Sequence, residues 1–104
     1  MTDANVAVHD DGDSRYEITF DGQPAGFARY VRRGGRTFFV HTEIDPKFEG
    51  KGLGSKLASG ALDAERARGG KIVPMCPFIR SYIDRHPETA DLVDRDMLAT
   101  IDGG

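Results

Sequence analysis

Gly50, Gly52 and Gly54 alternate with other residues between a strand-like segment and a helix-like segment of the chain. The strand-like segment covers residues 36–44, and the apolar side chains of residues 53–68 recur with helical spacing. Glycine lets the backbone approach a ligand closely, and the first N–H groups of a helix have no partner inside the helix. Glycines at a strand-to-helix junction therefore predict a binding site for a phosphate or pyrophosphate group.

Two familiar phosphate-binding loops do not fit this junction. A Walker loop ends in Gly-Lys-Ser/Thr, whereas Gly54 is followed by Ser55 and then Lys56. Dinucleotide-binding folds carry Gly-x-Gly-x-x-Gly after the first strand of a parallel sheet. This chain has Gly-x-Gly-x-Gly spacing after segments that predict an antiparallel meander, so both classes are excluded.

The two glycines at residues 34–35 separate two β-rich runs and predict a hairpin with a two-residue turn. If the residues that flank this turn pair, the register sets Ala28 opposite His41. The period of two then places Phe39, His41 and Glu43 on one face of the sheet. A bulge near the strand end would change that assignment.

The rest of the pattern predicts an α+β (mixed α/β) fold. Pro24 is expected to lie outside the central strands, because proline cannot donate to the ladder there. The element order is an antiparallel meander followed by a βαβ unit, which gives a mixed sheet. The expected strands cover residues 5–9, 16–20, 26–33, 36–44 and 71–75, and the expected helices cover residues 53–68, 77–86 and 93–101.

The composition is that of one soluble domain. The chain has 104 residues, of which 38% are hydrophobic, and no apolar run reaches the ~20 residues of a membrane span. A net charge of −3 argues against a nucleic-acid-binding protein, and no ligand spacing predicts a metal site. The single cysteine, Cys76, and an acidic start unlike a signal peptide predict a cytoplasmic protein. We expect one domain over residues 1–104, monomeric or weakly dimeric, with flexible residues at 1–13 and 102–104.

Five short motifs follow one another over residues 14–93. They are HTEI at 41–44, GKGLG at 50–54, ALD at 61–63, VPMCPF at 73–78 followed by Tyr82, and RHP at 85–87. In this order they resemble the short stand-alone GNAT-type N-acetyltransferase-like proteins, which are minimal members of the GNAT superfamily. The resemblance implies a GNAT-like acyl-CoA N-acyltransferase fold, in which a mixed sheet is splayed at a bulge. It also implies that acetyl-CoA or CoA binds in the splay.

The resemblance assigns the glycine-rich loop to the pyrophosphate of CoA, which its backbone N–H groups would bind. Glu49 stands where the superfamily usually has Gln or Arg. The arginines at 29, 32, 33 and 36, around the hairpin turn, are expected to form a solvated edge. Their alternative role is to attract the adenosine 3′-phosphate of CoA or an acidic partner. The residues implied in cofactor binding are Glu49, Gly50, Lys51, Gly52, Leu53, Gly54 and Ser55.

Three residues are candidates for catalysis. Cys76 precedes a helix that begins with proline, and a helix N-terminus favours a nucleophilic sulfur. In the resembled family the matching cysteine lies near the thiol end of CoA and has been proposed as catalytic; the alternative is a small buried apolar residue. His41 or Glu43 would accept a proton from an amine. The alternative is that His41 is a hydrogen-bonded core histidine and Glu43 a solvated carboxylate.

These expectations combine into one function and one alternative. The function is the transfer of an acetyl group from acetyl-CoA to an amine acceptor that the sequence does not identify. The amine attacks the thioester directly, or Cys76 first takes the acetyl group and then passes it on. The alternative is a CoA-binding module without turnover, which senses CoA or acts through a protein partner.

Overall fold

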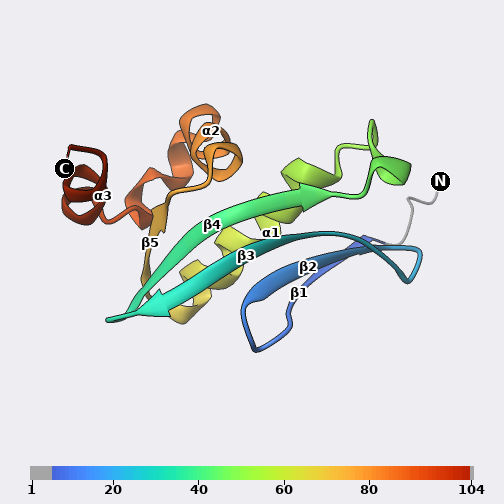
Figure 1. The fold of residues 1–104 in the computed structure, drawn as a ribbon, viewed down its shortest axis with the longest axis horizontal. Coiled ribbons are helices and arrows are strands. Elements are labelled where there is room, and N and C mark those ends of the chain that lie inside the picture. Colours follow the sequence, from blue (N-terminus) through green and yellow to red (C-terminus); the bar gives the residue numbers. More distant parts are fainter. Residues whose placement is uncertain (1–5, 104) are drawn as a thin grey trace.

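The computed structural model describes residues 6–103, which form a five-stranded sheet with its strands in the order β1-β2-β3-β4-β5 (Figure 1). Strands β1 to β4 are antiparallel, and β5 is parallel to β4. The meander and the βαβ unit predicted from the sequence are therefore confirmed. The strands are β1 (Val6–Asp10), β2 (Arg15–Phe20), β3 (Gln23–Arg33), β4 (Arg36–Ile44) and β5 (Lys71–Pro74). The helices are η1 (Pro46–Phe48), α1 (Leu53–Arg68), α2 (Pro77–Arg85), η2 (Pro87–Leu92) and α3 (Arg95–Gly103).

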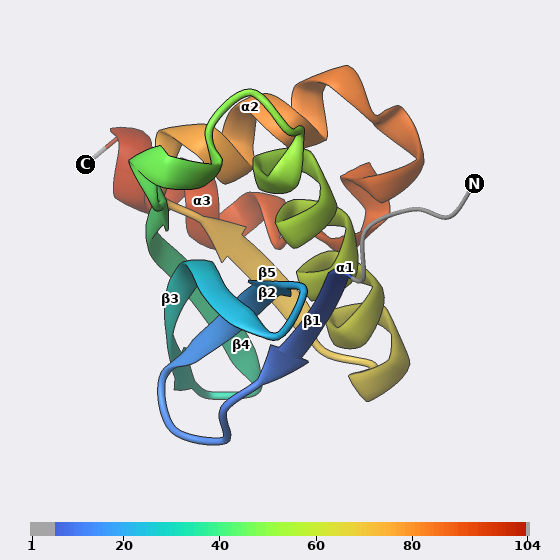
Figure 2. The same cartoon turned by 90° about the vertical axis from the view of Figure 1, so that its right-hand side faces the viewer.

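Helix α1 connects β4 to β5 and covers one face of the sheet, which we call the inner face (Figure 2). Its apolar stripe packs there in one core with alternate residues of the strands. Gly60 allows the close approach of α1 to β1, because a Cβ at this position would lie 2.7 Å from the Cβ of Val8. The buried residues of this core include Tyr16, Ile18, Ala28, Tyr30 and Phe39 from the sheet, and Leu57, Ala58, Ala61 and Leu62 from α1.

Strand β4 contains a bulge that changes which side chains face the core. Near the hairpin turn, Tyr30 pairs with Phe39 as predicted. The register then shifts, so that Ala28 pairs with Thr42 and not with His41. The predicted shared face is therefore wrong for Phe39, which is buried on the inner face, whereas His41 and Glu43 do share a face and lie exposed on the outer one. One extra residue in a bulged strand moves every later side chain to the opposite face.

The pairing of β4 with β5 ends at the bulge. The last pair joins Phe39 and Pro74, and the N–H groups of Met75 and Cys76 both donate to the carbonyl oxygen of Phe39, at 3.0 and 2.9 Å. Residues 40–44 continue β4 without a partner in β5, and the two strands diverge from this point (Figure 1). The splay of the sheet at a bulge, expected from the resemblance, is present.

Pro24 lies inside β3, contrary to expectation, because a second bulge leaves Ala25 unpaired beside it. Proline is tolerated at a bulge since the ladder hydrogen bond is already lost there. Asn5, predicted to begin the first strand, lies outside the described residues, and the flexibility expected of residues 1–13 and 102–104 stays a prediction. None of the described helices is long and apolar enough to cross a membrane.

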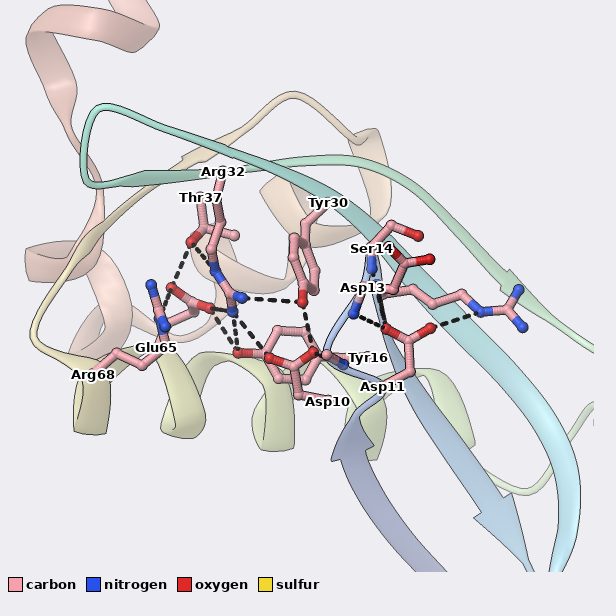
Figure 3. Close-up of polar contacts among 12 residues, drawn as sticks. Asp10, Asp11, Asp13, Ser14, Tyr16, Tyr30, Arg32, Thr37, Glu65 and Arg68 are labelled. Carbon is pink, nitrogen blue, oxygen red and sulfur yellow. Dashed lines mark hydrogen bonds and ion pairs between the residues drawn. The ribbon is translucent and has the colours of Figure 1, made fainter.

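A buried polar cluster joins the C-terminal half of α1 to the sheet (Figure 3). The carboxylate of Glu65 is fully buried and accepts hydrogen bonds from Tyr16 at 2.6 Å, Thr37 at 2.7 Å and Arg32 at 2.8 Å. Burial by itself raises the pKa of Glu65, but these three hydrogen bonds outweigh it and hold the pKa below its ordinary value. Arg32 is thus part of this cluster and not of a solvated edge.

Candidate functional site

The glycine-rich loop is held by η1 on one side and α1 on the other. Gly50 and Gly52 have φ angles of 85° and 72°, in the left-handed region that favours glycine. A Cβ at either position would meet nothing within 4 Å, so the backbone conformation, and not crowding, selects glycine here. The loop accordingly has open space in front of it.

Helix α1 begins without a side-chain cap. Its N-cap residue is Gly52, which has no side chain to bond the first N–H groups of the helix. The N–H groups of Leu53, Gly54 and Ser55 then have no acceptor within the helix, and the positive end of the helix dipole lies among them. The side chain of Leu53 is buried in the core, so it offers only its backbone to a ligand. The N–H of Glu49 donates to the carbonyl of Pro46, so that part of the loop is already bonded.

Cys76 is the N-cap residue of α2, directly after the point where β5 leaves β4. Its side chain is buried, with 4% of its surface exposed. Its Sγ atom lies 3.2 Å from Oγ1 of Thr42, the residue that the bulge turns to the inner face. Helix α2 also lacks a side-chain cap, and Pro77 occupies its first turn, where no N–H is needed.

The first turns of the two helices touch. A Cβ on Gly54 would lie 2.7 Å from Cζ of Phe78, so the glycine is needed to seat this ring. Gly54 and Phe78 are each the second residue of their helix. Two uncapped helix N-termini therefore meet beside the unpaired part of β4. The structural role of Gly54 was not foreseen from the sequence, which indicated only a close approach to a ligand.

His41 and Glu43 lie on the outer face of the same part of β4. Their side chains are more than half exposed, and Nε2 of His41 lies 3.5 Å from Oε2 of Glu43. The ring of Phe27 lies 6.1 Å from the imidazole of His41. The predicted catalytic residues are thus divided: Cys76 lies on the inner side of β4 and the His41–Glu43 pair on the outer side. Both sides border the edge that β5 leaves free.

Thr42 is a site residue that sequence reasoning missed. The alternation of β4 directed attention to its neighbours, and no signal in the sequence locates the bulge that turns it inward. His86, the remaining histidine of the resembled motifs, donates from Nδ1 to the carbonyl oxygen of Tyr82, 2.8 Å away, and its imidazole stacks on the Tyr82 ring. Among residues 6–103, no three His, Cys, Asp or Glu side chains are grouped to bind a metal ion.

Comparison with known proteins assigns the family. A search of curated proteins found no match. A family model described as GCN5-related N-acetyl-transferase matches residues 15–92, which run from the start of β2 to the end of η2. The matched part includes the glycine-rich loop, the splay between β4 and β5, and Cys76. The chain therefore belongs to the GCN5-related N-acetyltransferase family.

Proposed function

We propose that this protein transfers the acetyl group of acetyl-CoA to an amine. Its family supports a general acyltransferase function. The observation that carries the finer proposal is the free edge of β4 at residues 40–44, bordered by two uncapped helix N-termini. Such an arrangement suits a long ligand with an anionic centre and a thioester at one end.

Three parts of acetyl-CoA are assigned in this proposal: the pyrophosphate, the pantetheine arm and the thioester. The pyrophosphate would bind the N–H groups at the start of α1, which lack acceptors. The pantetheine arm has amide groups that can pair with the free edge of β4, as an added strand would. The thioester would then lie near Cys76, where β4 and β5 separate.

In the direct route, the amine approaches from the outer face. Its nitrogen forms a bond to the carbonyl carbon, the bond from that carbon to sulfur breaks, and CoA leaves as the thiolate. His41 or Glu43 takes the proton that the amine loses, and the thiolate is protonated from solvent. The exposed His41–Glu43 pair supports this route because it is open to an acceptor.

In the covalent route, the sulfur of Cys76 attacks the thioester, CoA leaves as the thiol, and the amine then takes the acetyl group from Cys76. The position of Cys76 at a helix N-terminus supports this route. Its burial and its contact with a hydroxyl, which is not a base, support it less. We therefore favour the direct route.

The experiment is a screen of amines and peptides with acetyl-CoA, in which released CoA is measured. Acceptor-dependent release of CoA, with formation of an acetylated amine, supports the proposal. Binding of acetyl-CoA without release for any acceptor would overturn it and favour a CoA-binding module. The variant Glu43→Gln shows whether the release of CoA depends on this carboxylate, because it keeps the size of the side chain but removes the carboxylate.

A further inference from the structure

A pocket lies where α2, η2 and α3 meet the end of β5 (Figure 1). Its volume is about 450 Å³, within the usual range of small-molecule sites. Its apolar lining includes the buried residues Pro74 and Ile83, together with Ala90, Val93 and Leu98. The pocket can therefore cover an apolar group as large as a phenyl ring.

Two charged residues of opposite sign line this pocket from different helices. Asp84 comes from α2 and Arg95 from α3, and both are exposed. Neither forms an ion pair with any residue that the structure describes. A third charged residue, Arg80, is engaged, because its Nε and Nη2 atoms donate to the carbonyl oxygen of Pro74, each at 3.1 Å. The pocket thus offers one carboxylate and one guanidinium group to a ligand.

The spacing along each helix places these charges next to the apolar lining. Asp84 follows Ile83 directly in α2, and both line the pocket. In α3, Leu98 lies three residues after Arg95, so the two side chains share one face of the helix. A ligand whose apolar group contacts Ile83 and Leu98 would therefore have a carboxylate and a guanidinium group close to its polar end.

The side of the pocket that α3 forms is attached to the sheet. The N–H of Asp94 donates to the carbonyl oxygen of Ile72 at 2.9 Å, and Nε of Arg36 lies 2.6 Å from the carboxylate of Asp94. The same carboxylate accepts a hydrogen bond from the N–H of Met97 at 3.0 Å, in the first turn of α3. These contacts hold the backbone of Arg95 in place before a ligand binds, which lowers the entropic cost of binding.

The pocket is separate from the proposed acetyl-CoA site. The part of the chain that the family model matches ends at residue 92, so Val93, Arg95, Leu98 and Ala99 lie beyond it. Among the described residues that line the pocket, none belongs to the glycine-rich loop, to the free edge of β4 or to the His41–Glu43 pair. The proposed function therefore does not account for this pocket.

We propose that the pocket binds an apolar α-amino acid as a zwitterion, with its side chain against the apolar lining, its ammonium group on Asp84 and its carboxylate on Arg95. A zwitterion matches this pair of charges better than a simple acid or amine, because either of those would leave one charge of the pocket without a counterion. The bound amine is an ammonium ion, which is not a nucleophile. The amino acid is thus a ligand of this pocket and not the acceptor of the acetyl group, and the proposal does not depend on acetyl transfer.

The test measures the binding of L-phenylalanine to the full chain by NMR titration in the absence of CoA. Two analogues each remove one charge: 3-phenylpropionate lacks the ammonium group, and L-phenylalaninol has a hydroxyl group in place of the carboxylate. Each analogue should bind about fivefold more weakly, the upper end of the effect expected for a contact with an exposed charged side chain. L-Alanine keeps both charges but lacks the ring, and it should bind at least about tenfold more weakly.

Variants assign each charge to its residue. Asp84→Asn should abolish the preference for L-phenylalanine over 3-phenylpropionate, and Arg95→Gln should abolish the preference over L-phenylalaninol. Arg85→Gln and Asp96→Asn are the matched controls, because these residues adjoin the tested ones in the same helices but do not line the pocket. Both controls should keep both preferences. Ala99→Leu, at an exposed position of α3, should weaken the binding of L-phenylalanine at least about threefold, because the larger side chain fills part of the pocket.

Several results would overturn the proposal. The first is the absence of L-phenylalanine binding to the wild type at concentrations up to about 10 mM. The second is equal affinity for L-phenylalanine and both analogues, which would indicate an apolar pocket that does not recognise charge. The others are unchanged binding in Ala99→Leu, and loss of the preferences in the controls to the same extent as in Asp84→Asn and Arg95→Gln. Because CoA is absent from every measurement, each of these results leaves the acetyl-CoA proposal standing, and the screen of acceptors tests that proposal separately.

Discussion

The Sγ atom of Cys76 lies 3.2 Å from Oγ1 of Thr42, across the gap that opens where β4 and β5 diverge. This contact exists because a bulge after Phe39 reverses which side chains of β4 point to the inner face. The same reversal turns His41 and Glu43 outward. A ligand on the free edge of β4 would therefore have a thiol and a hydroxyl on one side, and an imidazole and a carboxylate on the other.

The direct route makes Glu43 or His41 the group that accepts a proton. We expect the variant that removes this group, Glu43→Gln or His41→Ala, to lower kcat about 100-fold, the lower end of the usual effect of a general base. The KM for acetyl-CoA should change little, because both side chains lie on the outer face. Steady-state kinetics checks this. As a control, Glu17→Gln removes an outer-face carboxylate of β2, paired with Arg15 at 2.8 Å, and should leave kcat within a factor of two or so.

The left-handed conformation of Gly52 gives a second prediction. Gly52→Ala should lower the free energy of unfolding by about 1–2 kcal/mol, because a Cβ strains this conformation even where space is open. It should also weaken CoA binding, since the strain shifts the N–H groups at the start of α1. Gly12 is a matched control with a φ angle of 82° and no atom within 4 Å of a Cβ. Gly12→Ala should show the stability loss alone; an equal loss of affinity would contradict the loop assignment.

Gly54→Ala should act differently, through Phe78. The new methyl group would force the ring out of its position 2.7 Å away and so separate the first turns of α1 and α2. We expect a loss of stability that is largely absent when the same change is made in a Phe78→Ala background. A double-mutant cycle from urea unfolding should give an interaction energy of at least about 0.5 kcal/mol. Additive effects would mean that the two helices do not depend on this contact.

The sequence predicted the order of the elements because each prediction depended on local patterns. The turn at residues 34–35, the glycine-rich loop and the proline at the start of α2 all have short-range signatures. The bulge in β4 has none, since Val40 is an apolar residue that the structure leaves 36% exposed. The sequence therefore singled out Cys76, His41 and Glu43 as candidates but could not predict which side of β4 each would occupy, and it missed Thr42.

The burial of Glu65 in the core is another feature that the sequence did not predict. This residue occupies an apolar stripe of α1, yet nothing near it in the sequence indicates a buried carboxylate. Its hydrogen-bond donors come from three strands: Tyr16 from β2, Arg32 from β3 and Thr37 from β4. Only the assembled sheet brings these donors together, so burial of Glu65 follows from tertiary structure alone.

The buried cluster around Glu65 predicts a loss of stability in acid. The pKa of Glu65 is lowered in the folded chain, so its stabilising contribution is complete above its ordinary value of 4.5 and declines as the pH falls through the lower folded value. Glu65→Gln should reduce the free energy of unfolding at neutral pH by about 3 kcal/mol, because Arg32 loses its buried partner. It should also flatten the decline in acid.

Urea unfolding across the acid range checks this, and two further variants make the result interpretable. Asp91→Asn breaks the exposed ion pair of Asp91 with Arg66 and should cost less than about 1 kcal/mol. Tyr16→Phe removes one donor to Glu65 and keeps the ring, so it gives a measurable intermediate if Glu65→Gln does not fold. If the free energy of unfolding declines in acid as much in both Tyr16→Phe and Glu65→Gln as in the wild type, carboxylates other than Glu65 control this decline.

The final prediction concerns Cys76. Because its sulfur is buried and contacts only the hydroxyl of Thr42 among described polar side chains, we expect no acetyl group to accumulate on it when acetyl-CoA is added without an acceptor. Intact-protein mass measures this directly. Cys76→Ala should still bind CoA and keep most of its kcat, since the pyrophosphate site and the His41–Glu43 pair lie elsewhere. The covalent route would instead be established if the wild type carried a stoichiometric acetyl group that Cys76→Ser lacks, and if both Cys76 variants lost turnover. In that case Thr42→Val should slow the acetylation step, because it removes the hydroxyl that contacts the sulfur.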